Sequence, residues 1–350
     1  MRDESGKIVL HVVESFGAGV ASAVRSFLDA TSDLEHHLLF ARRSTEPLSP
    51  SALEGFRTAE ELPSGLFASA VAVRRRFADL RPDVVHAHSS IAGALVRIAL
   101  PRRSNTQVVY SPHCFSFERL DKTPIWRAIF RTIEIALASR TDAFALCSPH
   151  EVATVAKWRG TARIVLVPNR ASVGTAQLDH VPSAGVAQIV TVGRLGIQKD
   201  PGYFLSVVTE MRRQREISAT WIGGGDAAWE EELIAAGVRV TGWVDSPLVQ
   251  EHLSRADLYV HSAQWEGFPI AIIDAAHTRT PAVCRRVSTL DFLDPELTAE
   301  SPFDLAQLAL STLSDATANL NAWAATCRTQ NAKYQREGLL EAYNVGKPHA

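Results

Sequence analysis

The chain has 350 residues, of which 46% are hydrophobic and 21% are charged, and its formal net charge at pH 7 is −2. This length allows two domains, each with its own core, and the composition is that of an ordinary soluble enzyme. No apolar run approaches the roughly twenty residues of a membrane span, and no secretory signal is visible, so we expect a cytoplasmic protein.

The first half of the chain alternates predicted strands and helices, which indicates a parallel sheet with crossover helices. Short apolar runs predict strands at residues 8–13, 35–41, 84–88, 107–111, 143–148 and 163–167. Apolar residues at helical spacing predict the main helices at residues 20–30, 66–80, 91–100 and 124–138.

The turn after the first predicted strand, residues 15–20, is rich in small residues. Such a turn lets backbone amides approach a phosphate or a sugar. The third glycine of the dinucleotide fingerprint is missing at Ser22, and no acidic residue ends the next strand, so a dinucleotide site is not indicated. We expect Gly19 to make the closest backbone approach to a ligand.

A histidine, His113, follows the strand at 107–111 and a Ser-Pro turn. Two interpretations remain open from the residues alone, a half-buried hydrogen-bonded histidine and a ligand-binding one. In the strand at 84–88, His88 at the strand end is a better candidate for a site than His86.

The second half is predicted to begin with a linker at residues 173–187, where Gly174, Pro182 and Gly185 stand among small polar residues. A second domain follows at residues 188–329, with strands at 189–192, 219–222, 238–241, 258–261 and 282–284. Residues 320–343 are predicted to be helical.

Two cations follow the first strand of this second domain. Arg194 and Lys199 lie between the strand at 189–192 and a helix that begins near Gly202. Ligands of open α/β sheets bind beyond the carboxyl ends of strands, so both side chains are placed where a diphosphate could be held.

A turn formed by Glu266, Gly267, Phe268 and Pro269 leads into an apolar segment at residues 270–276. We expect a helix there with proline at its first position, and the free amides of such a helix start attract phosphate. Asp274 lies eight residues after Glu266, about two helical turns further. Two carboxylates near an anion-binding helix start suit the hydroxyl groups of a sugar and a ribose. From this segment alone a second interpretation stays open, a loop that leads into a core helix and contains a Glu and an Asp without a binding role.

Taken together, seven segments resemble the GT4 family of retaining glycosyltransferases, which have the GT-B fold. Each is weak alone, but they follow the family's order and spacing, which chance would also have to reproduce. The segments are PDVVHAH at 82–88, SPH at 111–113, VPN at 167–169, GRL at 193–195 with Lys199, IGGGD at 222–226, VTGW at 240–243 and EGFP at 266–269. There are two departures: Arg170 replaces the usual glycine, and Asp274 replaces the usual glutamate.

The resemblance implies an α/β GT-B architecture, with two Rossmann-like parallel-sheet domains facing each other across a cleft. Residues 1–172 would form the acceptor-side domain, joined by a final helix at 330–350, and residues 188–329 would bind the nucleotide sugar. By the same resemblance, His113, Arg194, Lys199 and Glu266 would serve catalysis. Donor-binding residues would be Gly19, Arg194, Lys199, Gly223, Gly242, Trp243, Glu266, Gly267, Phe268, Pro269 and Asp274.

We therefore expect a retaining glycosyltransferase that moves a sugar from a nucleoside diphosphate to an acceptor hydroxyl. The setting would be bacterial cell-surface glycan, glycolipid or secondary-metabolite assembly. The resemblance implies front-side attack, with the leaving phosphate taking the acceptor's proton. The partners would be the nucleotide-sugar donor and a sugar or lipid-linked acceptor, with no nucleic acid.

We expect neither a cofactor nor a metal. No Asp-x-Asp motif is present, which argues against the metal-dependent GT-A enzymes, and the four cysteines show no metal-binding spacing. Two alternatives remain open. A GT-B nucleotide-sugar 2-epimerase would need acid–base carboxylates in the site, and a non-catalytic sugar-nucleotide-binding scaffold would explain the departures at Arg170 and Asp274.

Charge is distributed unevenly along the chain. Residues 1–175 hold 22 Lys or Arg against 17 Asp or Glu, and residues 176–350 hold 14 against 21, a difference of +5 and −7. Basic residues beside apolar ones at 71–77 and 126–131 allow peripheral contact with anionic lipid at the inner face of the membrane. The alternative is that these charges are the solvated faces of helices.

Overall fold

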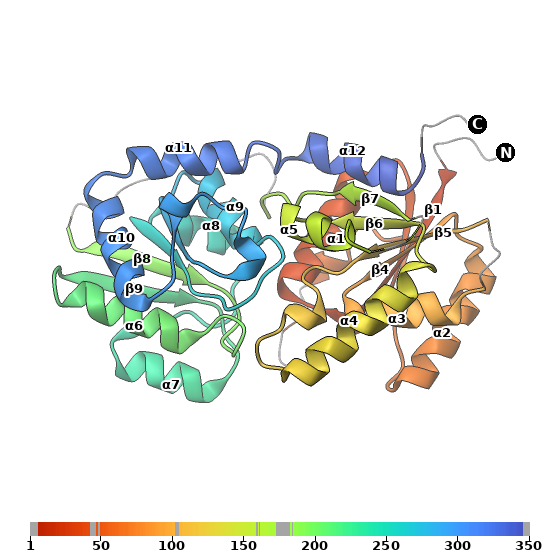
Figure 1. Cartoon of the computed structure of the whole chain (residues 1–350), viewed down its shortest axis with the longest axis horizontal. Coiled ribbons are helices and arrows are strands. Elements are labelled where there is room, and N and C mark those ends of the chain that lie inside the picture. Colours follow the sequence, from red (N-terminus) through yellow and green to blue (C-terminus); the bar gives the residue numbers. More distant parts are fainter. Residues whose placement is uncertain are drawn as a thin grey trace. The chain divides into compact units, whose positions relative to one another are not determined.

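The computed structural model describes residues 6–42, 47, 50–101, 105–158, 160, 162–172, 183 and 185–345. The chain divides into two compact units, the first formed by Met1–Asn169 with Ala332–Ala350 and the second by Arg170–Asn331. Each unit has one parallel sheet covered by helices (Figure 1). The predicted fold class, α/β with two parallel-sheet domains, is confirmed.

The first unit contains a seven-stranded sheet in the order β3-β2-β1-β4-β5-β6-β7, with every strand pair parallel among the described residues. Its strands are β1 Ile8–Phe16, β2 Glu35–Arg42, β3 Thr58–Glu61, β4 Val84–His88, β5 Gln107–Ser111, β6 Ala143–Leu146 and β7 Arg163–Leu166. Strand β3 was not predicted. It lies at the sheet edge and is mostly exposed, so it lacks the apolar run that identifies the others.

Helices cover both faces of this sheet. Helices α1 (Ala18–Ala30) and α12 (Ala332–Ala342) share one core with one face. The other face packs against α2 Leu66–Leu80, α3 Ser90–Ala99, α4 Pro124–Ala138 and α5 Pro149–Val155. Figure 1 shows α2, α3 and α4 on one side of the sheet and α12 on the other. Short 3₁₀ turns occupy Pro50–Leu53 and Ser116–Glu118.

The second unit contains a six-stranded parallel sheet in the order β10-β9-β8-β11-β12-β13. Its strands are β8 Ala187–Val192, β9 Ile217–Ile222, β10 Val238–Val240, β11 Leu258–His261, β12 Ala282–Arg285 and β13 Thr298–Ala299. One face packs against α6 Pro201–Arg212, α7 Ala227–Ala235 and α10 Pro302–Ser314. The other packs against α8 Ser246–Ser254, α9 Ile270–His277 and α11 Thr317–Thr326, and 3₁₀ turns lie at Ser288–Leu290 and Pro295–Leu297.

In the second half, two predicted helix bounds are wrong and most of the predicted linker lies outside the described residues. The predicted helix at 320–343 is two helices, α11 and α12, because residues 327–331 form turns in which Gln330 N donates to Cys327 O at 3.0 Å. Pro269 is not the first helical residue; its ψ of 122° is extended, and α9 begins after it. Of the predicted linker at 173–187, residues 173–182 and 184 lie outside the described residues, and Ala187 already belongs to β8.

Both sheets reverse their strand order once, between β1 and β4 in the first and between β8 and β11 in the second. At such a point the loops that leave the two strands turn in opposite directions and open a crevice beyond the carboxyl ends. The loops after β8 and β11 contain Arg194, Lys199 and Glu266. The topology of the second unit therefore brings these predicted site residues to one edge of its sheet.

Candidate active site

The loops after β8 and β9 pack backbone against backbone. Leu195 N donates to Gly224 O at 2.8 Å, and Asp226 N donates to Leu195 O at 3.2 Å. A Cβ atom at Gly223 would lie 2.2 Å from Gly193 O, and Gly223 has a φ of 136°, so glycine is required there. This pairing fixes the backbone on both sides of Arg194.

An ion pair joins the loop after β8 to the loop after β11. Lys199 Nζ lies 2.5 Å from Glu266 Oε1, and their side chains are 20% and 12% exposed. The backbone around the pair is also tied down, since Gln264 N donates to Gln198 O at 2.8 Å and Ser262 Oγ donates to Lys199 O at 2.5 Å. Two residues predicted from separate motifs are thus held in direct contact.

A second ion pair in the same network was not predicted. Arg285, at the end of β12, donates to Asp200 Oδ2 at 2.6 Å, and its guanidinium lies 4.1 Å from the centre of the Tyr203 ring. Gln264 Nε2 donates to the same Asp200 oxygen at 3.0 Å. The position of Arg285 at a strand end was the signal available in the sequence, but its partner lies 85 residues away.

The turn from Glu266 to Pro269 is held in place by contacts with the segment after β12. Phe268 is 4% exposed and its ring centroid lies 5.4 Å from that of Phe292, while Glu266 N donates to Thr289 Oγ1 at 3.1 Å. Among the described residues no side chain caps the start of α9. Ile272 N donates to Pro269 O at 3.1 Å, and the binding of an anion at this helix start stays a prediction.

The predicted residues Gly242 and Trp243 lie beside the loop after β9. Gly223 N donates to Thr241 Oγ1 at 3.1 Å, and Gly223 forms a bridge with Gly242. A Cβ at Gly224 would lie 3.0 Å from the Trp243 ring. The loops after β8, β9 and β10 thus form one packed group.

Asp274 has a partner that the sequence did not reveal. Its two carboxylate oxygens accept hydrogen bonds from Ser172 N at 2.7 Å and Ser172 Oγ at 2.9 Å, and the residue is 3% exposed. Burial raises the pKa of Asp274 to about 6, although the Ser172 hydrogen bonds oppose this. In this structure Asp274 anchors the segment that enters the second unit, and its ribose contact stays a prediction.

In the first unit, His113 and Gly19 follow the carboxyl ends of β5 and β1. His113 has a φ of 51°, and its Nε2 lies 3.0 Å from His88 Nδ1. Burial lowers the pKa of His113 to about 4. Gly19 is in the first turn of α1 rather than in the preceding loop, and a Cβ there would meet nothing within 4 Å.

A buried carboxylate that was not predicted from the sequence holds the His113 loop in place. Glu151, in the first turn of α5, accepts from Cys114 N and Cys147 N, each at 2.8 Å. These two amides follow β5 and β6, so one side chain joins two loops at the carboxyl edge. Burial raises the pKa of Glu151.

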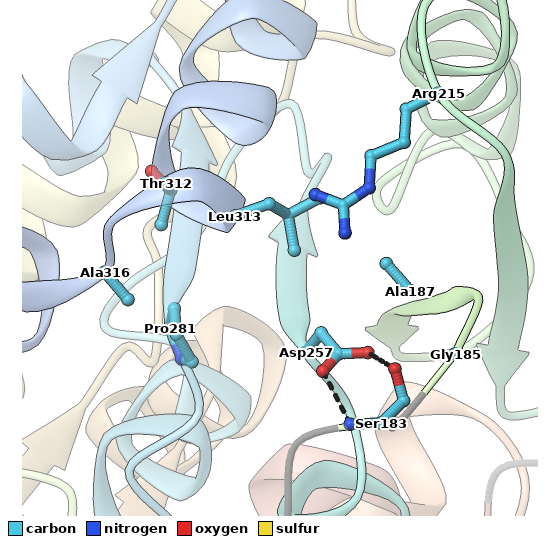
Figure 2. A pocket seen from close by; sticks show the side chains of 9 residues that line it. All are labelled: Ser183, Gly185, Ala187, Arg215, Asp257, Pro281, Thr312, Leu313 and Ala316. Atoms are coloured by element: carbon cyan, nitrogen blue, oxygen red, sulfur yellow. Dashed lines mark hydrogen bonds between the residues drawn. The ribbon is translucent and has the colours of Figure 1, made fainter.

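A cavity of about 200 Å³ lies at the opposite edge of the second sheet (Figure 2). Its lining includes Ala187 at the start of β8, Asp257 just before β11 and Pro281 just before β12. Asp257 accepts from Ser183 N at 2.9 Å and from Ser183 Oγ. The cavity is therefore at the amino ends of the strands, away from Lys199 and Glu266, and we do not assign the donor to it.

Comparison with known proteins agrees with the architecture and the motifs. A family model described as "Glycosyl transferase 4-like domain" matches residues 18–170, and one described as "Glycosyl transferases group 1" matches residues 187–315. The fold and these matches define a GT-B glycosyltransferase. The chain belongs to the GT4-type glycosyltransferases.

Individual relatives are distant. An uncharacterized 41.2 kDa protein in the cps region of Klebsiella pneumoniae is 24% identical, over 81% of this chain and 82% of its own. The UDP-Gal:alpha-D-GlcNAc-diphosphoundecaprenol alpha-1,3-galactosyltransferase of Escherichia coli is 24% identical over 59% of this chain, which spans 58% of that relative. The crystal structure of Anabaena HepE with UDP-glucose matches with a TM-score of 0.76 at 15% identity, over 96% of this chain and 99% of that one.

Proposed function

We propose that the chain is a retaining glycosyltransferase that uses a nucleoside diphosphate sugar and no metal. The main support is the Lys199–Glu266 ion pair, in the same packed group of loops as Arg194 and at the uncapped start of α9. Cations beside a helix start suit a diphosphate, and a carboxylate suits sugar hydroxyls. All of these groups lie at the carboxyl edge of one parallel sheet.

In this proposal the site acts by stabilising the leaving diphosphate. Departure of the diphosphate builds negative charge, and fixed donors aimed at that charge lower the barrier. Arg194, Lys199 and the amides near Gly267 supply them. An ammonium group has three donor positions, so Lys199 can donate to a phosphate while keeping Glu266.

The anomeric configuration of the sugar is retained if the acceptor attacks on the face from which the diphosphate leaves. A phosphate oxygen then accepts the proton of the acceptor hydroxyl as the new glycosidic bond forms and the sugar–phosphate bond breaks. Glu266, bound to Lys199, orients the hydroxyls of the donor sugar. The family resemblance of its loop assigns a contact with the donor sugar to His113. No side-chain base is needed.

We assign the reaction to bacterial glycan assembly. The relative from Escherichia coli is named for a UDP-galactose donor and a diphosphoundecaprenol acceptor, and the HepE structure contains UDP-glucose. These names support a nucleoside diphosphate donor and a sugar or lipid-linked acceptor for this chain as well.

A lipid-linked acceptor is also consistent with the surface of α4. Ile125, Trp126, Ile129 and Ile133 are between 40% and 73% exposed on this helix, and Arg131 is exposed beside them. Within the described parts of the chain, every helix is too short or too polar to cross a membrane. We propose that α4 contacts the inner membrane surface. The fraction of protein that sediments with anionic vesicles should be lower for Trp126→Ser than for the wild type. Equal fractions for the two proteins would contradict this contact.

Metal independence is tested directly by chelation. Among the described residues, the one group of three or more potential ligands close enough to share an ion is His11, His86 and His88. Arg194 and Lys199 supply positive charge instead. We therefore expect turnover to persist in EDTA; a complete loss that Mg²⁺ or Mn²⁺ restores would refute metal-independent transfer.

The activity itself is tested in two steps. Thermal shift with UDP-, GDP-, ADP- and dTDP-sugars identifies the donor, and mass spectrometry then follows products with lipid-linked and small sugar acceptors. Transfer with retained anomeric configuration supports the proposal. Conversion of the free donor without any acceptor would favour the 2-epimerase, and donor binding with neither transfer nor hydrolysis would favour the scaffold.

A further inference from the structure

Four histidines of the first unit form one continuous hydrogen-bonded chain. His36 Nδ1 lies 2.9 Å from His11 Nε2, His11 Nδ1 lies 3.0 Å from His88 Nε2, and His88 Nδ1 lies 3.0 Å from His113 Nε2. His36, His11 and His88 come from the adjacent strands β2, β1 and β4 and are at most 3% exposed. His113, in the loop after β5, is the half-buried outer end.

The donor–acceptor direction of this row of histidines is fixed at its inner end, where His36 contacts a backbone carbonyl. His36 Nε2 lies 2.9 Å from Thr31 O, and a carbonyl oxygen can only accept, so His36 Nε2 carries the proton. The Thr31 hydroxyl agrees: it donates to Phe27 O at 2.7 Å, so it can only accept from His36 Nε2 at 3.2 Å. A neutral His36 must then accept at Nδ1.

While the rings are neutral, each of the next two histidines, His11 and His88, also donates from Nε2 and accepts at Nδ1. Burial favours the neutral rings, because it lowers the pKa of His11, His36 and His88, and that of His113 to about 4. Each of the four rings therefore carries its N–H proton on Nε2. The Nδ1 lone pair of His113 is the one that no other histidine of the row uses.

We propose that His36, His11 and His88 fix the tautomer of His113, so that His113 Nδ1 accepts a hydrogen bond from a hydroxyl group of the sugar substrate. This rests on the proposed function, in which His113 contacts the donor sugar. The three inner histidines are positioning residues that act through His113. They do not conduct protons across the unit, because a backbone carbonyl closes the inner end. Aligned hydrogen bonds polarise one another, which strengthens the acceptor at Nδ1.

A metal held by His11, His86 and His88 is the rival interpretation of this region. Their ring nitrogens lie within 4.8 Å of one another. However, His86 Nε2 lies 2.9 Å from Ser111 Oγ, which itself donates to Ala145 O, and His86 Nδ1 lies 2.9 Å from the Tyr343 hydroxyl. Every ring nitrogen of the three already has a hydrogen-bond partner, and three neutral ligands would leave a buried dication uncompensated.

The tautomer is measured by long-range ¹H–¹⁵N NMR on the full chain labelled with ¹⁵N-histidine at pH 7.5. We expect His113 to show a protonated Nε2 and an unprotonated Nδ1. His36→Leu removes the fixed inner end and should produce a mixture of tautomers at His113. His36→Asn places an amide oxygen near the position of Nδ1 and should restore the single tautomer. His37→Leu is the matched control, because His37 is the next residue, equally buried, but bonded to Thr58 and Glu35.

Steady-state kinetics test whether the tautomer of His113 affects use of the donor. His36→Leu should lower kcat/KM for the donor by roughly twofold to tenfold, the effect of one neutral hydrogen bond, whereas His36→Asn and His37→Leu should stay near the wild-type value. A protonated Nδ1 on wild-type His113, an unchanged tautomer in His36→Leu, or stoichiometric Zn²⁺ binding at His11, His86 and His88 would overturn the proposal. So would equal kcat/KM in His36→Leu and His36→Asn. If the wild type transfers sugar from none of the donors, the proposed function is refuted instead. The NMR result would then still test the tautomer of His113.

Discussion

At the scale of single residues, Lys199 is held in place by contacts within the second unit. Its ammonium group contacts Glu266, and its backbone carbonyl accepts from Ser262 Oγ. A lysine fixed in this way loses little further side-chain freedom when a phosphate binds, so more of the contact energy appears as affinity.

Replacing this cation should therefore weaken nucleotide binding. We expect Lys199→Ala or Arg194→Ala to reduce affinity for the nucleoside diphosphate about tenfold to hundredfold, since each removes a charge-assisted hydrogen bond of about 1.5–3 kcal/mol. Isothermal calorimetry with UDP, GDP, ADP and dTDP measures this. Arg255→Ala, which removes a cation with a 72% exposed side chain just after the end of α8, is the control. Wild-type affinity in both site variants would refute the phosphate contact.

Asp274 has a structural role and a predicted role in ribose binding, and two variants separate them. An ionised carboxylate accepts about four hydrogen bonds, and Ser172 and Gln250 account for at most three, so one position remains for a ribose hydroxyl. We expect Asp274→Asn to lower both the free energy of unfolding, by about 1–2 kcal/mol, and the donor affinity, by roughly threefold to tenfold. Ser172→Ala should affect unfolding alone. If Asp274→Asn binds donor as the wild type does, Asp274 is a structural anchor only.

At the scale of elements, strands β1, β2 and β4 hold a set of neutral histidines that makes the first unit sensitive to acid. Burial lowers the pKa of His11, His36, His86, His88 and His113 below the ordinary value of 6.5. Between pH 6.5 and the folded-state values, the unfolded chain binds protons that the folded chain does not. The free energy of unfolding therefore falls as pH falls, by up to about 1.4 kcal/mol per pH unit for each histidine.

In the second unit, the acid sensitivity due to buried His261, whose pKa is also lowered by burial, is opposed by Asp274. Its folded pKa of about 6 lies above the ordinary 3.8, so its protonation favours the folded state as pH falls below 6. We expect hydrogen exchange at pH 5.5 relative to pH 7.5, corrected for intrinsic rates, to show larger loss of protection in β1 and β4 than in β8 and β11. Equal loss in both units would contradict this prediction.

At the scale of the whole molecule, the chain returns to the first unit after completing the second. Helix α12 belongs to the first unit although it follows Asn331. Gln335 Nε2 donates to Pro168 O at 3.0 Å, and Arg336 forms an ion pair with Asp33 at 2.6 Å. Leu339 is 0% exposed and packs in the core with α1. The last helix thus completes one face of the first sheet.

Truncating the buried face of this helix should destabilise the first unit selectively. We expect Leu339→Ala to lower the free energy of unfolding by about 2–5 kcal/mol, as a large-to-small change in a core does. Tyr334→Ala, at a position 42% exposed on the same helix, should change it by less than about 0.5 kcal/mol. Urea unfolding gives the totals, and hydrogen exchange of β6 and β7 locates the effect. Similar losses in both variants would show that α12 is not part of this core.

The local elements and the order of the motifs could be predicted from the amino-acid sequence alone. Strands β4, β5 and β11 have the predicted bounds because a buried parallel strand is a short apolar run that ends at a turn. The Lys199 and Glu266 motifs were recognisable because a turn before a helix depends on neighbouring residue types. Pairs between distant segments were decided by the tertiary structure: Arg285 with Asp200, Ser172 with Asp274, and the four histidines from β2, β1, β4 and the loop after β5. No local pattern encodes such a pair, because the second partner comes within reach only when separate strands join one sheet and their ends meet at one edge.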